Sequence, residues 1–183
     1  MPPARPGPFS PAPGFEAPLE MLSACHGRVG QQCATLRRLA AHLPAHGADA
    51  QARAAAAAVI RYFDTSAVHH HEDEEVDLFP ALVESMAGSD ATCIRALVDG
   101  LAREHRELGA RWARVRAVLA RVSAGEAAPL AHDDVDALVG LYERHIAREE
   151  DELLPMAARL LDDATLDAIG RAMRERRGIH SID

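Results

Sequence analysis

Aromatic and β-branched residues are scarce in this chain. Aromatic residues make up 4% of its 183 positions, whereas Ala, Leu, Arg and Glu are abundant. Because β-sheets depend on β-branched and aromatic side chains, and the abundant residues are strong helix formers, the composition predicts an all-α fold. The hydrophobic share of 48% is enough to fill the core of one ordinary domain.

The chain also lacks an excess of basic residues and any long apolar run. It has 20 basic and 28 acidic residues, which gives a formal net charge of −8. Binding to phosphates needs a basic face, so we expect neither nucleic acid nor an acidic membrane surface as a partner. No run reaches the roughly 18 apolar residues of a membrane helix, and the Pro-rich start does not resemble a secretory signal. We therefore expect a cytoplasmic protein.

Cysteine is rare as well. The three cysteines, Cys25, Cys33 and Cys93, are an odd number and lack the spacing of a metal finger. A disulfide framework is not expected in a reducing compartment. We predict that all three are small core residues.

Four long helical stretches follow a Pro-rich arm at residues 1–18. They are predicted at residues 19–43, 48–86, 90–123 and 133–161, with Asp90 as a candidate N-cap. Short connections between four helices favour an up-down-up-down four-helix bundle over residues 19–161. Residues 162–183 form the remainder, in which a shorter helix is predicted at 163–177, ending just before Gly178.

Each of the four stretches carries one histidine in its line of core residues. In the third stretch, apolar residues recur at alternating steps of three and four, as in a bundle core, and His105 stands at one of these positions. Matching positions of the other three stretches contain His26, His70 and His145. The sequence therefore predicts four histidines that point inward.

An internal repeat adds carboxylates to two of these histidines. Residues 70–80, HHEDEEVDLFP, and 145–155, HIAREEDELLP, both fit the pattern H-x-x-x-E-E-x-x-L-[FL]-P. The first glutamates of the two copies are Glu74 and Glu149. Each copy follows a stretch with a lone histidine, which indicates two helix hairpins related by a pseudo-two-fold axis. We predict that Pro80 and Pro155 kink or reshape their helices.

This spacing suits a pair of metal ions. Residues four apart on a helix lie on one face with Cβ atoms about 5–6 Å apart, so each repeat can direct a histidine and a glutamate to one centre. Burying an unpaired carboxylate costs several kcal/mol, and a divalent cation removes that cost. Imidazole with carboxylate suits iron, manganese or zinc. Incomplete coordination would leave positions for water, hydroxide, O2, peroxide or NO.

The pattern resembles the hemerythrin-like, HHE cation-binding family over residues 19–161. The resemblance implies a non-haem di-iron site, with two iron ions joined by an oxo or hydroxo bridge, although zinc or manganese fits the same groups. It implies these six metal ligands: His26 and His70 on one iron, His105 and His145 on the other, and Glu74 and Glu149 between them.

The chain departs from the oxygen-carrying members in two ways. Those carriers have two histidines four apart on the third helix, whereas the corresponding neighbours of His105 are Leu101 and Gly109. They also use H-x-x-x-x-D in the fourth helix, where this chain has H-x-x-x-E. Both differences argue against reversible oxygen carriage. Gly109 is expected to leave room for a ligand or water near the second metal.

The neighbours of the six residues have less defined roles. His71 is either a further ligand or outer partner, or an interfacial or solvated residue, and we favour the latter. Tyr142 is either a core tyrosine or a residue that reaches the site. The acidic residues around the motifs are predicted to form solvated faces: Glu72, Asp73, Glu75, Asp77, Glu150, Asp151 and Glu152.

Three functions fit these features. The favoured one is a di-iron protein that binds, senses or reacts with O2, peroxide or NO. The second is an iron-handling or peroxide-consuming enzyme. The third is a regulatory bundle stapled by metal, whose Pro-rich arm or Arg-rich tail contacts a protein partner. The sequence identifies no catalytic residue, protein partner or oligomeric state, and it does not decide whether the protein is an enzyme.

Overall fold

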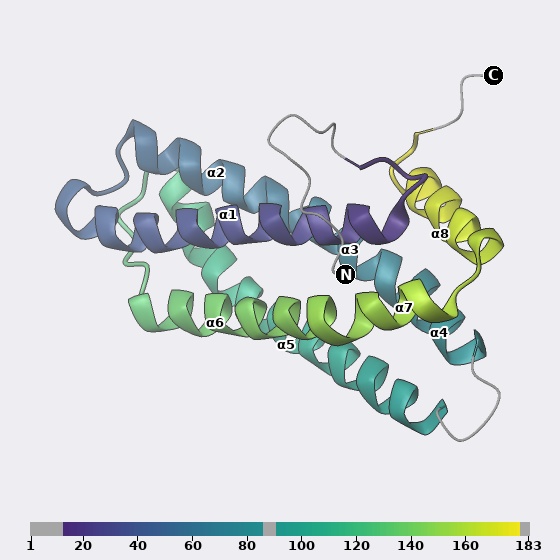
Figure 1. The fold of residues 1–183 in the computed structure, drawn as a ribbon. Helices are drawn as coiled ribbons and strands as arrows, with labels where there is room; N and C mark the ends of the chain where they lie inside the picture. Colours follow the sequence, from purple (N-terminus) through teal and green to yellow (C-terminus); the bar gives the residue numbers. More distant parts are fainter. Residues whose placement is uncertain (1–12, 86–90, 180–183) are drawn as a thin grey trace.

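The computed structural model describes residues 13–85 and 91–179, and within them the chain forms four helical rods and one further helix (Figure 1). The first rod is α1 (Pro18–His46). The second consists of α2 (Ala50–Asp64), α3 (Ser66–Glu72), the π-helix η1 (Asp73–Leu78) and α4 (Phe79–Ser85). The third is α5 (Ala91–Ser123). The fourth consists of α6 (His132–Arg148), the π-helix η2 (Glu149–Leu153) and α7 (Leu154–Leu160), and α8 (Asp163–Arg176) follows it.

The rods pack as a closed ring of four. α1 contacts α2 and α6, and α5 contacts the same two helices from the other side. This arrangement confirms the predicted up-down-up-down four-helix bundle with an additional C-terminal helix. α8 packs against α1 and η1 at the end of the bundle where α1 begins (Figure 1).

Local sequence signals set several helix boundaries. Asp49 caps α2 by accepting a hydrogen bond from the backbone N–H of Ala52 at 2.8 Å. α1 extends beyond the predicted end at residue 43, because Pro44 fits within the helix and the turn comes only at Gly47, where φ is +64°. The candidate cap Asp90 lies outside the described residues.

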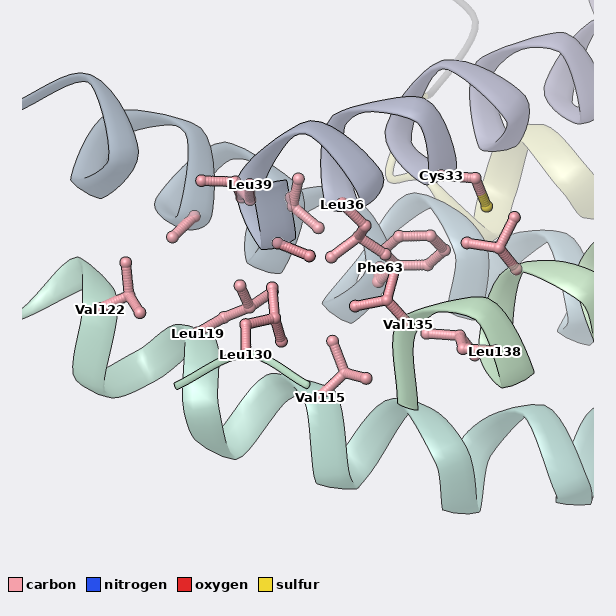
Figure 2. Close-up of a cluster of buried hydrophobic side chains, with 14 of the residues drawn as sticks. Cys33, Leu36, Leu39, Phe63, Val115, Leu119, Val122, Leu130, Val135 and Leu138 are labelled. Carbon is pink, nitrogen blue, oxygen red and sulfur yellow. The ribbon is translucent and has the colours of Figure 1, made fainter. Parts of the chain in front are cut away.

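Two apolar clusters fill the bundle, and the metal-ligand candidates lie between them. Figure 2 shows the cluster that includes Leu36, Phe63 and Leu119. The other cluster, nearer α8, includes Leu22 and Leu101. Along every rod, the candidate histidines and glutamates fall between residues of one cluster and residues of the other. The two apolar clusters thus shield the candidate histidines and glutamates from water at both ends of the bundle.

The cysteines divide between the core and the surface. Cys25 and Cys33 are buried, as predicted, and both are free thiols. The prediction for Cys93 was wrong, because its side chain is exposed. The next residue, Ile94, faces the core, and a rotation of about 100° per residue turns Cys93 away from it.

Candidate metal centre

The two copies of the repeat form α-helix and π-helix in the same order. His70 lies in the last turn of α3 and Glu74 in η1, while His145 lies in the last turn of α6 and Glu149 begins η2. In the π-turns, the N–H groups of the residues just before the two prolines bond to the carbonyls of Glu74 and Glu149, five residues back. Proline has no N–H and crowds the preceding turn, so it favours this widening. The reshaping predicted at the prolines is therefore present.

All six candidate ligands lie in the interior. None is more than 6% exposed, and both glutamates are 0% exposed. Their donor atoms form two groups that share the glutamates. We call the group with His26 and His70 the first position, and the group with His105 and His145 the second position.

The nitrogens within each position lie close together. The Nε2 atoms of His26 and His70 are 3.2 Å apart, and those of His105 and His145 are 3.0 Å apart. Each histidine of a pair comes from a different rod, so the bundle itself creates both positions.

The two glutamates lie between the positions. Glu149 has one oxygen 3.1 Å from Nε2 of His26 and the other 2.9 Å from Nε2 of His145. Glu74 has one oxygen 3.4 Å from Nε2 of His70 and the other 3.4 Å from Nε2 of His105. Each carboxylate thus offers one oxygen to each position, as a bridging ligand of two ions does.

In three of the four imidazoles, Nδ1, the nitrogen that faces away from the centre, is hydrogen-bonded to a carboxylate. The Nδ1 atoms of His26 and His105 lie 2.6 Å from Glu150 and Glu75, respectively. These two glutamates are the second E of each repeat, and each holds the lone histidine of the other hairpin. Both glutamates are partly solvated, as predicted, but each is also hydrogen-bonded to a core imidazole, which was not predicted.

The third of these contacts was not predicted at all. Nδ1 of His145 lies 2.8 Å from Glu104, which also accepts a hydrogen bond from Arg148 at 2.9 Å. Hydrogen bonds to carboxylates place the ring proton on Nδ1, so the lone pair on Nε2 faces the centre. Glu104 immediately precedes the core histidine of α5, but nothing in the sequence pattern distinguishes it from the other acidic residues of that helix.

When the imidazoles are neutral, the two buried glutamates lack a compensating positive charge. Apart from their contacts with the candidate ligand imidazoles, all four oxygens of Glu74 and Glu149 are buried without a hydrogen-bond partner. At the second position, where both Nδ1 atoms face carboxylates, the lone pairs of the two Nε2 atoms also face each other. Unpaired buried carboxylates and converging lone pairs are unfavourable unless cations lie among them. The donor set of four imidazoles and two carboxylates therefore fits two ions of the iron, manganese or zinc type.

The pKa shifts show which residues of the centre take up protons in the metal-free protein. Burial lowers the pKa of His26, but hydrogen bonding to Glu149 and Glu150 outweighs it and raises the pKa to about 9. The pKa of His105 rises to about 10, because hydrogen bonds to Glu149 and Glu74 outweigh burial. Burial and the charge of Glu149 raise the pKa of Glu74 to about 7. Protons thus collect where cations would otherwise compensate the carboxylates.

His71 lies closer to the centre than we predicted. Its ring stacks on that of His105, with centroids 3.9 Å apart and planes 15° apart. Donor atoms of His71, His105 and His145 form a third group, within 4.8 Å of one another. The ring is half-buried between α3 and α5, which agrees with the favoured interfacial role and excludes full solvation. Residues 69–71 are three consecutive histidines, and the sequence did not indicate whether the neighbours of His70 also lie near the centre.

Asp73 is a residue whose environment was mispredicted. It is 0% exposed instead of solvated. Its carboxylate pairs with Arg176 and accepts two hydrogen bonds from Arg177, with Nη2 2.6 Å from Oδ2 and Nη1 3.1 Å from Oδ1. Arg176 also pairs with Asp77 at 2.7 Å. The end of α8 therefore holds η1, the segment that carries Glu74.

Two further expectations concern residues near the second position. Gly109 is exposed, and nothing lies within 4 Å of where its Cβ would be, so the room it leaves is at the surface. Tyr142 is buried in the apolar cluster that includes Leu36 and Phe63, and its ring centroid lies 5.4 Å from that of Phe63 and 6.5 Å from that of His71. Its ring thus belongs to the core and borders the histidines.

The fold and the buried donor set together define a four-helix-bundle protein of the metal-binding type. The family model described as Hemerythrin HHE cation binding domain matches residues 17–157, and the chain belongs to this family. A protein of Haemophilus influenzae, described as uncharacterized, is 30% identical over 165 residues, which cover 90% of this chain and 92% of that protein. Among the described helices, none is long and apolar enough to cross a membrane.

Proposed function

We propose that this protein is a cytoplasmic, non-haem di-iron protein that binds, senses or reacts with O2, peroxide or NO. The observation that carries the proposal is the pair of fully buried glutamates, each with one oxygen directed at each of two histidine pairs. The residues of the chain would hold both ions through Nε2 atoms and carboxylate oxygens. When bound, iron would supply redox chemistry and open positions for small ligands.

Iron loading tests this proposal. Metal-free protein loaded with Fe2+ without oxygen, and then exposed to air, should contain about two irons per chain by elemental analysis and show the near-ultraviolet absorption of paired ferric ions. Glu74→Ala and His145→Ala should lose both signals. Glu152→Ala changes an exposed carboxylate of η2 and should retain them. Wild-type protein that binds no iron, or ligand variants that keep two irons and the spectrum, would contradict the proposal.

A surface pocket favours reaction over passive binding as a second candidate function. The pocket has a volume of about 270 Å³ and lies between α3–η1 and α5, where His71, Glu75, His105 and Arg106 line it. Because His105 belongs to the second position, the pocket borders the centre, and we infer that a small solute approaches from this side. Such access supports peroxide consumption or iron handling. Peroxide turnover tests this second candidate function. The iron-loaded protein should consume peroxide faster than the metal-free protein, and Val76→Trp, which narrows the pocket, should slow this consumption.

A further inference from the structure

The two halves of the centre are not equivalent, although the repeat relates them. When residues 70–80 are aligned with 145–155, His71 corresponds to Ile146. The first copy therefore carries an extra imidazole next to its ligand histidine, where the second copy carries an aliphatic side chain. The ring centroid of His71 lies 5.8 Å from that of His70 at the first position, but the ring makes its closest contact at the second position. It stacks on His105, and its centroid is 6.0 Å from that of His145.

The contacts of the Nδ1 atoms also distinguish the second position from the first. At the second position both imidazoles have a carboxylate on Nδ1, whereas at the first position only His26 has one. Nδ1 of His70 is buried without a hydrogen-bond partner. A carboxylate behind a ligating imidazole fixes its orientation and increases its basicity, which strengthens the bond to a metal. The second position is therefore the better donor set even before His71 is counted.

His71 is suited to bind metal. A neutral imidazole offers a nitrogen lone pair to a cation. Two nitrogens bound to one ion at about 2.1 Å each are at most about 4.2 Å apart. The three donor atoms lie within 4.8 Å of one another, so a small rotation is sufficient. His71 and His105 also line the same surface pocket.

We propose that His71 is a third imidazole ligand of the second position, and that this position consequently takes the first ion and holds it more tightly than the first position. This inference rests on the proposed metal-binding function. It assigns three imidazoles to one ion and two to the other, with the glutamates shared between them. The chain thereby obtains a fifth histidine from α3 instead of from the third rod.

Equilibrium binding of Co2+ to the full-length, metal-free protein tests the proposal. Titration in the presence of a competing chelator should show two steps, with the first ion bound more tightly. His71→Ile copies the residue of the second repeat and should weaken the first step on the order of 10- to 100-fold while leaving the second step nearly unchanged. His69→Ala, which alters a neighbour outside the three donor groups, should leave both steps unchanged.

Two more variants separate ligation from packing. His71→Gln keeps a polar side chain of similar length and should still weaken the first step if nitrogen ligation matters. Ile146→His adds an imidazole at the equivalent place of the other repeat and should strengthen the second step. Wild-type protein with two equal steps, or histidine variants that leave the first step unchanged, would overturn the inference while the metal centre stands. Absence of any Co2+ binding by wild-type protein would instead contradict the proposed function itself.

Discussion

Replacing Asp73 with alanine should destabilise the protein strongly, although this residue is not a candidate metal ligand. The Asp73 carboxylate is fully buried and is held by two arginines of the C-terminal helix end, whose side chains are 17% and 16% exposed. Removing one partner of a buried ion pair costs about 3–5 kcal/mol, because the remaining charge loses its compensation. Arg176 would retain Asp77 at 2.7 Å, so Arg177 bears most of the loss. We therefore expect the lower end of this range, about 3 kcal/mol.

This value converts to a measurable change in melting temperature. For a chain of this size, each kcal/mol shifts Tm by about 2–4 °C, so Asp73→Ala should lower Tm by roughly 6–12 °C. The measurement is thermal unfolding by circular dichroism with a chelator present, which removes the contribution of bound metal. The matched control is Asp151→Ala, because Asp151 is an exposed acid of the other π-helix, η2. Equal shifts for the two variants would show that the contact between α8 and η1 is not stabilising, and would refute this reasoning.

Three further predictions concern the centre and the packing of α8. Glu75→Gln removes the charge behind His105 and should weaken metal affinity by about 10- to 100-fold in chelator competition, whereas unchanged affinity would contradict the orienting role. In metal-free protein, the pKa values of about 9 for His26 and about 10 for His105 exceed the unfolded value of 6.5. Their stabilising contribution is therefore complete below pH 6.5 and disappears as the pH rises through 9–10, so Tm with chelator should fall between pH 7 and pH 10, and a rise would be inconsistent with these shifts. Gly170→Ala places a Cβ against the backbone carbonyl of Phe15 and should lower the free energy of unfolding, measured with denaturant, by about 1–3 kcal/mol. An unchanged free energy of unfolding would show that the segment around Phe15 moves aside easily.

The histidine and glutamate set could be recognised from the sequence because its geometry is local. Residues four apart on a helix face the same way whatever surrounds them, so His70 with Glu74 and His145 with Glu149 could be paired without coordinates. The lone histidines of α1 and α5 could be assigned inward positions because apolar residues flank them at core spacing. The resemblance to a known family then indicated how the six groups share two ions.

The contacts behind the ligands could not be predicted in this way. Glu74 and Glu75 are adjacent and chemically identical, and only the π-turn and the position of α5 determine that one faces the centre while the other holds His105. Asp73 looked like part of a solvated acidic run because its arginine partners lie more than 100 residues later in the chain. The direction of His71 depended on the ring of His105, which comes from a different rod.

By itself, the sequence determined the helical class, the four rods and the repeated histidine–glutamate pairs, because propensity and helical periodicity act over a few neighbouring residues. The tertiary structure alone decided which carboxylate supports which imidazole, which half of the centre the ring of His71 stacks against, and that α8 holds the π-helix carrying Glu74. These features depend on distances between side chains of different rods, and such distances exist only once the rods have packed.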